Sequence, residues 1–245
     1  MGKLVKAFLA ATTFLAILAT LLIVGVLYGV HEAIQPPQEF RVLETKIIDD
    51  GGYPSLLVKF RASKYPLDFY LYDELGRMVS LRSATEGVTA VTLSLVGLNP
   101  YTNIVGERSY TLKVFYLNNA IYEQNIRVHG VKPVIDLLDV GVKKKEILNE
   151  TYYVIEHLKI RVRNEGDTPL YIDNLNTHVL VDGESTAPVV GGGRVTILPG
   201  EERVVWIDIM DVYVEKPRVI VRLIIDGDSR SIEKVFSIDL EEHAS

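Results

Sequence analysis

The sequence AFLAATTFLAILATLLIVGVLYGV, residues 7–30, decides how this chain is organised, because it carries no charged side chain. A helix that crosses the hydrocarbon core of a bilayer needs about 20 apolar residues, and this run exceeds that length. Thr20 is one of its few polar residues, and a threonine hydroxyl can donate to a backbone carbonyl one turn earlier. The backbone must satisfy its own hydrogen bonds in lipid, so residues 7–30 are predicted to form a transmembrane helix.

Charged residues on the two sides of this run predict its orientation. Lys3 and Lys6 precede it, whereas no Lys or Arg follows before Arg41. Positive residues favour the cytoplasmic side, so residues 1–6 are expected in the cytoplasm and the C-terminal domains outside it. A cleaved signal peptide is the alternative. Its apolar region is usually about 7–15 residues long and ends at a small-x-small site, which this sequence lacks.

Composition limits the partners of the exported part. The 245 residues include no cysteine, which excludes disulfide frameworks and thiolate metal sites. The formal net charge of -6 argues against nucleic acid as a partner. The expected partners are membrane lipid, around residues 7–30, and another envelope or membrane protein. Association between copies of the chain is left open.

The segment after the helix has the pattern of β-strands. Residues 31–39 are predicted to be a linker, because Pro36 and Pro37 end the helix before them. From Phe40 onward, apolar and polar residues alternate with period two between turn signals such as Asp49-Asp50-Gly51-Gly52. About seven such strands in about ninety residues predict an immunoglobulin-like sandwich over residues 40–130.

Residues 131–240 repeat this pattern and predict a second sandwich, followed by a tail over residues 241–245. Within it, Lys143–Thr151 is interpreted as a polar loop, with Lys143-Lys144-Lys145 at a solvated hairpin tip. The predicted fold is therefore all-β: two immunoglobulin-like β-sandwiches in tandem, preceded by one N-terminal transmembrane α-helix. Without a long linker near residue 130, the sandwiches are expected to stack end to end with limited freedom. One large sandwich is the alternative.

Three short motifs in the second half have a familiar form: Asn164-Glu165-Gly166-Asp167-Thr168-Pro169, Val181-Asp182-Gly183 and Leu198-Pro199-Gly200-Glu201. This half resembles the CARDB-like and WHy-like sandwich domains of archaeal and bacterial surface proteins. The resemblance covers residues 134–238 at most and implies a fold, with no shared ligand or reaction. Read physically, Asn164 and Gly166 are expected to tolerate left-handed φ at the strand exit. Composition is compatible with a thermophilic archaeon.

A few residues could carry a modification, an ion or a contact. Asn149-Glu150-Thr151 is an acceptor sequence for N-glycosylation on the predicted outer side. Asp49-Asp50 and Asp226-Gly227-Asp228 could offer oxygens to calcium, but Asp-Gly also signals a hairpin turn, which we favour. Trp206 lies on the same strand face as Val204 and is predicted to pack in the core.

The sequence shows no recognisable motif of an enzyme active site. The chain has no Gly-x-Ser-x-Gly elbow and no phosphate-cradling glycine loop, and its five histidines do not share a ligand spacing. An anchored enzyme would need carboxylates that only the fold could bring together, such as Asp68, Asp73, Asp208 and Asp211. We predict no catalytic residue, no cofactor and no metal ion.

Two functions follow from these observations. The first is a single-pass, membrane-anchored extracytoplasmic protein that acts structurally or by protein interaction, as a cell-envelope protein or accessory subunit. The second is a filament or anchor subunit similar to archaeal type IV pilins and the archaellum. Lys6-Ala7-Phe8 matches the loose prepilin pattern, in which a peptidase would cut after Ala7. Either function would place the helix differently, in a bilayer or in a filament core.

Overall fold

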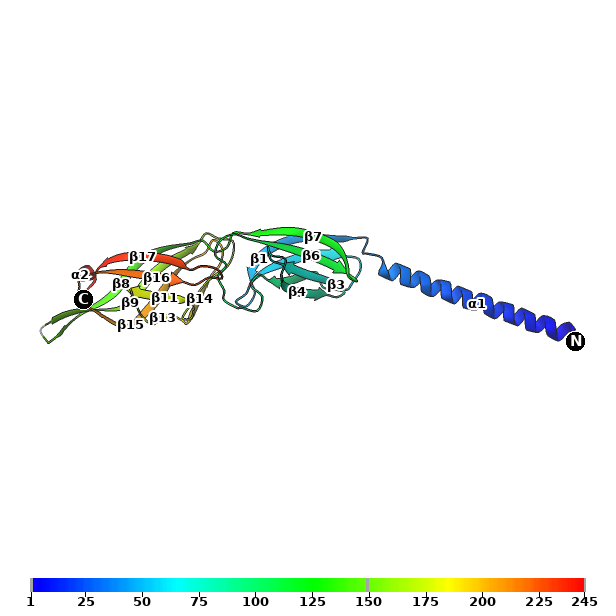
Figure 1. Cartoon of the computed structure of the whole chain (residues 1–245), viewed down its shortest axis with the longest axis horizontal. Coiled ribbons are helices and arrows are strands. Elements are labelled where there is room, and N and C mark those ends of the chain that lie inside the picture. The colour runs from blue at the N-terminus through cyan, green and yellow to red at the C-terminus, as the bar shows by residue number, and fades with distance from the viewer. Residues whose placement is uncertain (1, 149, 245) are drawn as a thin grey trace.

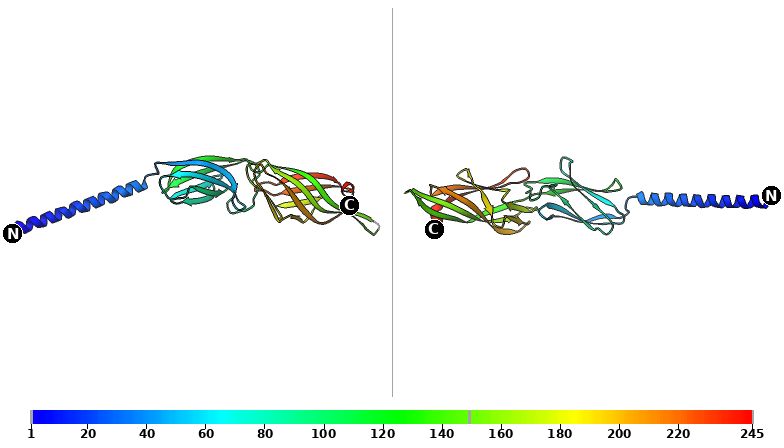
Figure 2. Two further views of the ribbon diagram at one scale, coloured as in Figure 1. Left: turned by 180° about the vertical axis from the view of Figure 1, so that it is seen from behind. Right: turned by 90° about the horizontal axis from the view of Figure 1, so that it is seen from below.

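The chain forms one long helix followed by two β-sandwiches in a line (Figure 1, Figure 2). The structure is a computed structural model that describes residues 2–148 and 150–244, with side chains except those of 3–13 and 211. Helix α1 (Gly2–Ile34) ends just before Pro36, as the prolines predict. Its segment Phe14–Ile34 has a mean hydropathy of 2.3 and none of it is buried. The expectation of an all-β body after a single apolar helix is confirmed.

Within the apolar helix, Thr20 satisfies its hydroxyl locally. Its Oγ1 donates to the backbone carbonyl of Ala16 over 2.8 Å. This is the bond expected of a threonine in an apolar environment, because it leaves no unpaired polar hydrogen on the helix surface.

The first sandwich consists of two antiparallel sheets. One sheet has the order β1-β2-β5 and the other has the order β4-β3-β6-β7. The fourth strand therefore pairs with the third, whereas in a constant-type immunoglobulin domain it joins the first sheet. The strands are β1 (Phe40–Asp49), β2 (Pro54–Ala62), β3 (Leu67–Tyr72), β4 (Met78–Ala84), β5 (Ala90–Ser94), β6 (Arg108–Tyr116) and β7 (Asn119–Val128).

The second sandwich repeats this topology with additions. Its sheets have the orders β13-β15-β9-β8 and β12-β11-β16-β17, and β10 pairs with β14 in a small third sheet. The elements are β8 (Pro133–Ile147), β9 (Glu150–Asn164), β10 (Leu170–Asp173), β11 (Thr177–Val181), β12 (Glu184–Ser185), β13 (Pro188–Val190), β14 (Arg194–Ile197), β15 (Glu202–Val214), β16 (Arg218–Ile225), β17 (Ile232–Asp239) and α2 (Leu240–His243).

The interpretation of Lys143–Thr151 as a loop is wrong. Strands β8 and β9 continue through it, and Lys144 pairs with Tyr153 in the ladder. The lysines lie within a strand, and Leu148, 93% exposed, stands near the turn instead. Charged side chains are compatible with a strand here, because this end of the hairpin projects beyond the sandwich into solvent (Figure 1).

Residues 241–244 are also more ordered than the predicted tail, and Ser245 lies outside the described residues. Helix α2 begins at Leu240, which is fully buried in the second core, and Asp239 caps it by accepting from the backbone N–H of Glu241. Ala244 then bridges to Val142 of β8. Sequence pattern alone missed this turn of helix because four residues carry no helical period.

Each sandwich has its own hydrophobic core, built from the inward-facing residues of both sheets. In the first, Phe60 and Phe69 lie on opposite sheets with ring centroids 4.7 Å apart, and both are buried. Tyr110, near the start of β6, is buried too and donates its hydroxyl to the Leu95 carbonyl over 3.1 Å. This bond is similar to the tyrosine corner of immunoglobulin domains, and it fixes the long loop between β5 and β6.

The variant Tyr110→Phe tests the hydrogen bond between the Tyr110 hydroxyl and the Leu95 carbonyl. Burial, together with the nearby Asp228 carboxylate, raises the pKa of Tyr110 from 10.0 to about 12. A raised tyrosine pKa means that the folded chain favours the neutral phenol, so its stabilisation is complete below pH 10 and is lost toward pH 12. We expect Tyr110→Phe to lower the free energy of unfolding by about 1 kcal/mol at neutral pH, through loss of the hydrogen bond.

The same variant should lose stability less steeply than the wild type as pH rises through this alkaline window. The measurement is urea unfolding of the full chain in detergent at a series of pH values. Tyr70→Phe, which alters a half-buried ring on the outer face of the same sandwich, is the control and should keep the wild-type slope. If the free energy of unfolding fell equally steeply with pH in the wild type and in Tyr110→Phe, Tyr110 would not be the group that titrates in this window.

Candidate functional site

The loops between the two sandwiches form a network of polar contacts, which we call the domain joint. Its centre is Asn103, whose side chain is fully buried. The Asn103 amide nitrogen donates to the carbonyls of Tyr171 (2.9 Å) and Asp226 (3.0 Å), and its oxygen accepts from the Tyr171 N–H over 2.7 Å. One side chain of the first sandwich thus satisfies three backbone groups of the second.

Two aspartates reinforce the joint from opposite sides. The Asp228 carboxylate accepts from the Val105 N–H over 3.0 Å and pairs with Arg108 at 3.0 Å, both in the first sandwich. In the other direction, the Tyr171 hydroxyl donates to Asp49 over 2.8 Å. Burial and this hydrogen bond raise the pKa of Tyr171 above its ordinary value. Each sandwich thus supplies one aspartate that accepts a hydrogen bond from the other sandwich.

These are the aspartates that could have offered oxygens to calcium. The turns Asp49–Gly52 and Asp226–Asp228 lie between paired strands, as hairpin turns do. Both turns lie at the joint, and protein donors contact the carboxylates of Asp49, Asp226 and Asp228. Asp226 accepts from Ser231 over 2.8 Å and contacts His178 Nε2 at 2.8 Å. Among the residues that the structure describes, no group of three or more His, Cys, Asp or Glu could hold a metal ion.

Aromatic and cationic groups close the joint at its edge. The Tyr101 ring meets the Tyr171 ring edge-on at 5.7 Å, and the Arg194 guanidinium lies 3.3 Å from the Tyr101 ring centroid. Asp173 holds the same guanidinium at 3.4 Å. A cation stacked on an aromatic face is attracted by the ring electrons, so this contact joins β14 of one sandwich to a loop of the other.

The linker between the sandwiches is also fixed. The Asp167 carboxylate accepts from the N–H groups of His129 and Gly130, each over 2.9 Å. A Cβ atom at Gly130 would lie 2.5 Å from the Ile104 carbonyl oxygen, and one at Gly166 would lie 2.1 Å from the Gly130 carbonyl oxygen. Only glycine allows these two close approaches of one backbone to another.

The expected left-handed φ of Asn164 and Gly166 is wrong, because neither is among the residues with positive φ. Gly166 serves the close approach just described. Asn164 is fully buried, and its amide donates to the carbonyls of Thr168 (2.8 Å) and Ile197 (3.1 Å). Its role is to satisfy loop carbonyls inside the second sandwich. Gly200, by contrast, has a positive φ in the turn that follows Pro199, a conformation that glycine adopts without strain.

A second polar contact ties helix α1 to the first sandwich. The last carbonyls of a helix have no partner within it and carry partial negative charge. Lys64 Nζ donates to the Glu32 carbonyl over 2.5 Å and to the Gln35 carbonyl over 3.3 Å. The Tyr116 hydroxyl donates to the Ala33 carbonyl. The sandwich therefore caps the helix, and the helix continues directly into the body.

Trp206 does not lie in the core, contrary to prediction. It does share a face of β15 with Val204, but that face points to solvent, and the ring is 42% exposed. The ring is partly covered by His157, at 4.9 Å between centroids, and by the Lys159 ammonium at 4.8 Å. Period-two alternation shows which residues share a face, and the packing of the two sheets decides which face is inside.

The other predicted residues lie apart. Asp68 and Asp73 belong to the first sandwich, where they accept from Ser83 and Arg77, whereas Asp208 lies on β15 of the second. The structure does not bring these carboxylates together, and the side chain of Asp211 is outside the described residues. Asn149 also lies outside the described residues, so its glycosylation stays a prediction. The processing motif Lys6, Ala7 and Phe8 lies within helix α1.

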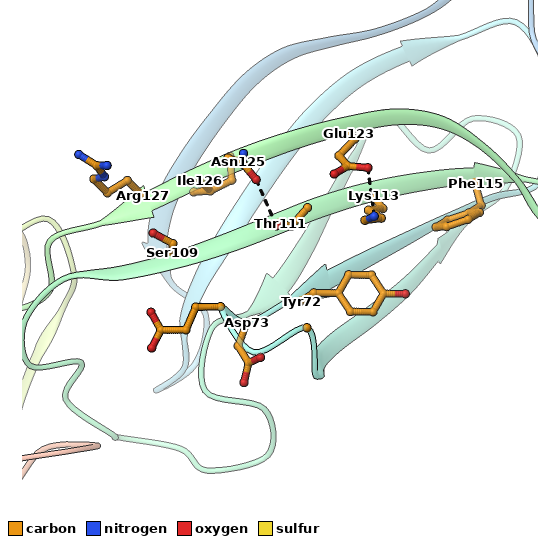
Figure 3. Close-up of a pocket in the computed structure, with 12 residues that line it drawn as sticks. Tyr72, Asp73, Ser109, Thr111, Lys113, Phe115, Glu123, Asn125, Ile126 and Arg127 are labelled. Atoms are coloured by element: carbon orange, nitrogen blue, oxygen red, sulfur yellow. Dashed lines mark hydrogen bonds and ion pairs between the residues drawn. The ribbon is translucent and has the colours of Figure 1, made fainter.

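A groove of about 940 Å³ crosses the outer face of the first sandwich, and we call it the first-sandwich groove (Figure 3). Strands β3, β6 and β7 form its floor. Thr111 donates to Asn125 over 3.1 Å and Lys113 pairs with Glu123 at 3.0 Å, so two polar pairs cross neighbouring strands. Sequence analysis did not single out this surface. The sequence feature that could have indicated it is Tyr72, an aromatic residue that alternates with the core residues of β3 and therefore lies on the outer face.

Comparisons with known proteins add little to this geometry. No family model matches the chain, and no curated protein matches it. Seventeen chains of solved structures match, among them one described as "Biofilm associated protein - BSP domain", with 10% identity and a TM-score of 0.27. The matched region covers 81% of this chain and 29% of the other protein's chain, so this chain spans less than a third of that protein. With a TM-score this low, no functional inference follows from the likeness.

Asn103→Ala is the direct test of the domain joint. Removing the amide leaves the Tyr171 N–H and the Asp226 carbonyl without their bonds to Asn103, whereas the Tyr171 carbonyl keeps its bond from Asn176. We therefore expect the free energy of unfolding to fall by about 1–3 kcal/mol. The angle between the sandwiches should also become variable. Because the chain has no cysteine, spin labels can be placed on introduced cysteines at Glu74 and Glu233, one in each sandwich.

Pulsed electron-spin distance measurements should show a narrow distribution for the wild type and a broader one for Asn103→Ala. Asn99→Ala, an exposed residue in the same loop, is the matched control and should keep the narrow distribution. An equally narrow distribution in Asn103→Ala would show that the side chain does not hold the joint.

Proposed function

We propose that this chain is a membrane-anchored extracytoplasmic protein that acts structurally or by interaction with another envelope or membrane protein. The observation that carries the proposal is the unbroken line from an exposed apolar helix, through a capped helix end, to two sandwiches fixed at the domain joint. Such a body holds its surfaces at set distances from the bilayer. Sandwich loops and outer faces can bind partners without catalytic residues.

The proposed topology places the N-terminus in the cytoplasm and both sandwiches outside. Lys3 and Lys6 support this orientation, since positive residues favour the cytoplasmic side. The proposal includes a role without catalysis, supported by carboxylates that lie apart, and an envelope or accessory subunit as the setting. The CARDB-like or WHy-like character of the second sandwich rests on the loop motifs, and an archaeal source rests on composition.

Cysteine labelling tests the topology, because every introduced cysteine is unique. The variants are Gly2→Cys, before the apolar run, and Glu242→Cys, exposed on α2. In intact cells, a membrane-impermeant maleimide should label Glu242→Cys and should label Gly2→Cys only after the membrane is permeabilised. The reversed pattern would overturn the proposed orientation.

The N-terminal residue of the membrane-extracted protein separates the remaining alternatives. Met1 or Gly2 is expected, because a retained anchor keeps its N-terminus. Phe8 would replace the anchor with pilin-like processing after Ala7, and a start beyond Val30 would show a cleaved signal peptide. The measurement is mass spectrometry of the intact protein together with its N-terminal peptide.

A further inference from the structure

Two aromatic side chains that the core does not use, of Tyr72 and Phe115, line the first-sandwich groove, and the Tyr70 ring lies against both of them. Tyr70, Tyr72 and Phe115 are half-buried on the outer face of β3 and β6 and belong to neither hydrophobic cluster. The Tyr70 and Tyr72 rings stack at 6.1 Å with 15° between planes, and Tyr70 meets Phe115 edge-on at 5.2 Å. Three mutually supported rings on a solvent-facing surface form a firm apolar platform.

Strand register places polar groups beside this platform in rows. Tyr72 lies opposite Thr111, and Thr111 lies opposite Asn125, so the three form one row across β3, β6 and β7. The next row is Tyr70, Lys113 and Glu123. Adjacent strands are about 4.8 Å apart, so a row spans roughly 10 Å, the length of about two sugar rings. In Figure 3, Tyr72 lies below the two polar pairs and Phe115 lies to their right.

The polar groups of the groove offer both donors and acceptors. Thr111 uses only the oxygen of the Asn125 amide, which leaves the amide hydrogens directed to solvent. Lys113 and Glu123 neutralise each other while staying accessible, with side chains 36% and 58% exposed. Asp73 is different: its carboxylate accepts from Leu75 and Arg77 and shapes the turn that closes one side. A ligand would thus meet Asn125, Lys113 and Glu123.

This combination selects a ligand class. The side chains that line the groove include three acidic groups, of Asp73, Glu74 and Glu123, and two basic groups, of Lys113 and Arg127. This excess of negative charge disfavours an anionic polymer such as nucleic acid. The polar rows disfavour an apolar ligand, because their desolvation would go uncompensated. A sugar fits both features, since its hydroxyls donate and accept while the C–H face of its ring packs on an aromatic ring. We propose that the first-sandwich groove binds a neutral oligosaccharide, with Tyr72 as the platform and Asn125 as the main hydrogen-bonding residue.

The proposal deepens the proposed function, on which it rests, because glycans are met outside the cytoplasm. Its test does not depend on topology. The full chain in lipid nanodiscs is titrated with three neutral hexasaccharides, of β-1,4-linked glucose, β-1,4-linked N-acetylglucosamine and β-1,4-linked mannose. Saturation-transfer NMR detects contact, and calorimetry measures affinity. At least one hexasaccharide should bind with a dissociation constant of about 1 mM or lower.

Variants assign the binding to the groove. Tyr72→Ala should weaken the affinity by about tenfold or more, and Asn125→Ala, at an exposed position that does not threaten folding, by about tenfold. Tyr72→Phe should retain most of the affinity, because the ring face remains. Tyr213→Ala, which removes a half-exposed ring of the second sandwich, is the matched control and should bind as the wild type does.

Two results would overturn the oligosaccharide proposal. One is the absence of binding by all three hexasaccharides at about 5 mM. The other is binding that Tyr72→Ala and Asn125→Ala leave unchanged. Either result leaves the labelling pattern of Gly2→Cys and Glu242→Cys unaffected, so failure of the groove and failure of the proposed topology are distinguishable.

Discussion

The whole molecule depends on one requirement, that polar backbone groups buried between two sandwiches find hydrogen-bond partners. Asn103 meets it with three bonds to Tyr171 and Asp226 from a fully buried position. An unpaired group at such a position costs about 1–3 kcal/mol, so the two sandwiches meet favourably only in the alignment that makes all three bonds. The salt bridge of Asp228 with Arg108 and the close backbone approaches at the linker glycines are compatible with this same alignment of the two sandwiches.

The same requirement governs the junction with the helix. The last carbonyls of α1 lie at its end, and Lys64 and Tyr116 of the first sandwich donate to them. Helix and sandwiches are consequently continuous, and each surface has a defined place along the line (Figure 1). The first-sandwich groove lies on the domain next to the helix, whereas the hairpin of β8 and β9 ends at the far side of the second. A partner's distance from the helix therefore indicates which surface it can reach.

The outer faces of the sheets carry exposed or half-buried aromatic side chains. Tyr70 and Tyr72 alternate with the core residues of β3, and Trp206 alternates with those of β15. In both sandwiches the ring gains neighbours on its own face, Phe115 for the tyrosines and His157 for the tryptophan. Such ring contacts add stability beyond the area they bury, so an exposed aromatic need not destabilise the sheet that presents it.

The sequence by itself determined the features that depend on neighbours in the chain: the apolar helix, its end before Pro36, the Thr20 bond and the alternation that defines the strands. Tertiary structure alone decided the rest. Alternation places Trp206 and Val204 on one face but cannot choose the inner face, which follows from sheet packing. Asn103 bonds to groups 68 and 123 positions away, and only the fold brings such distant residues together.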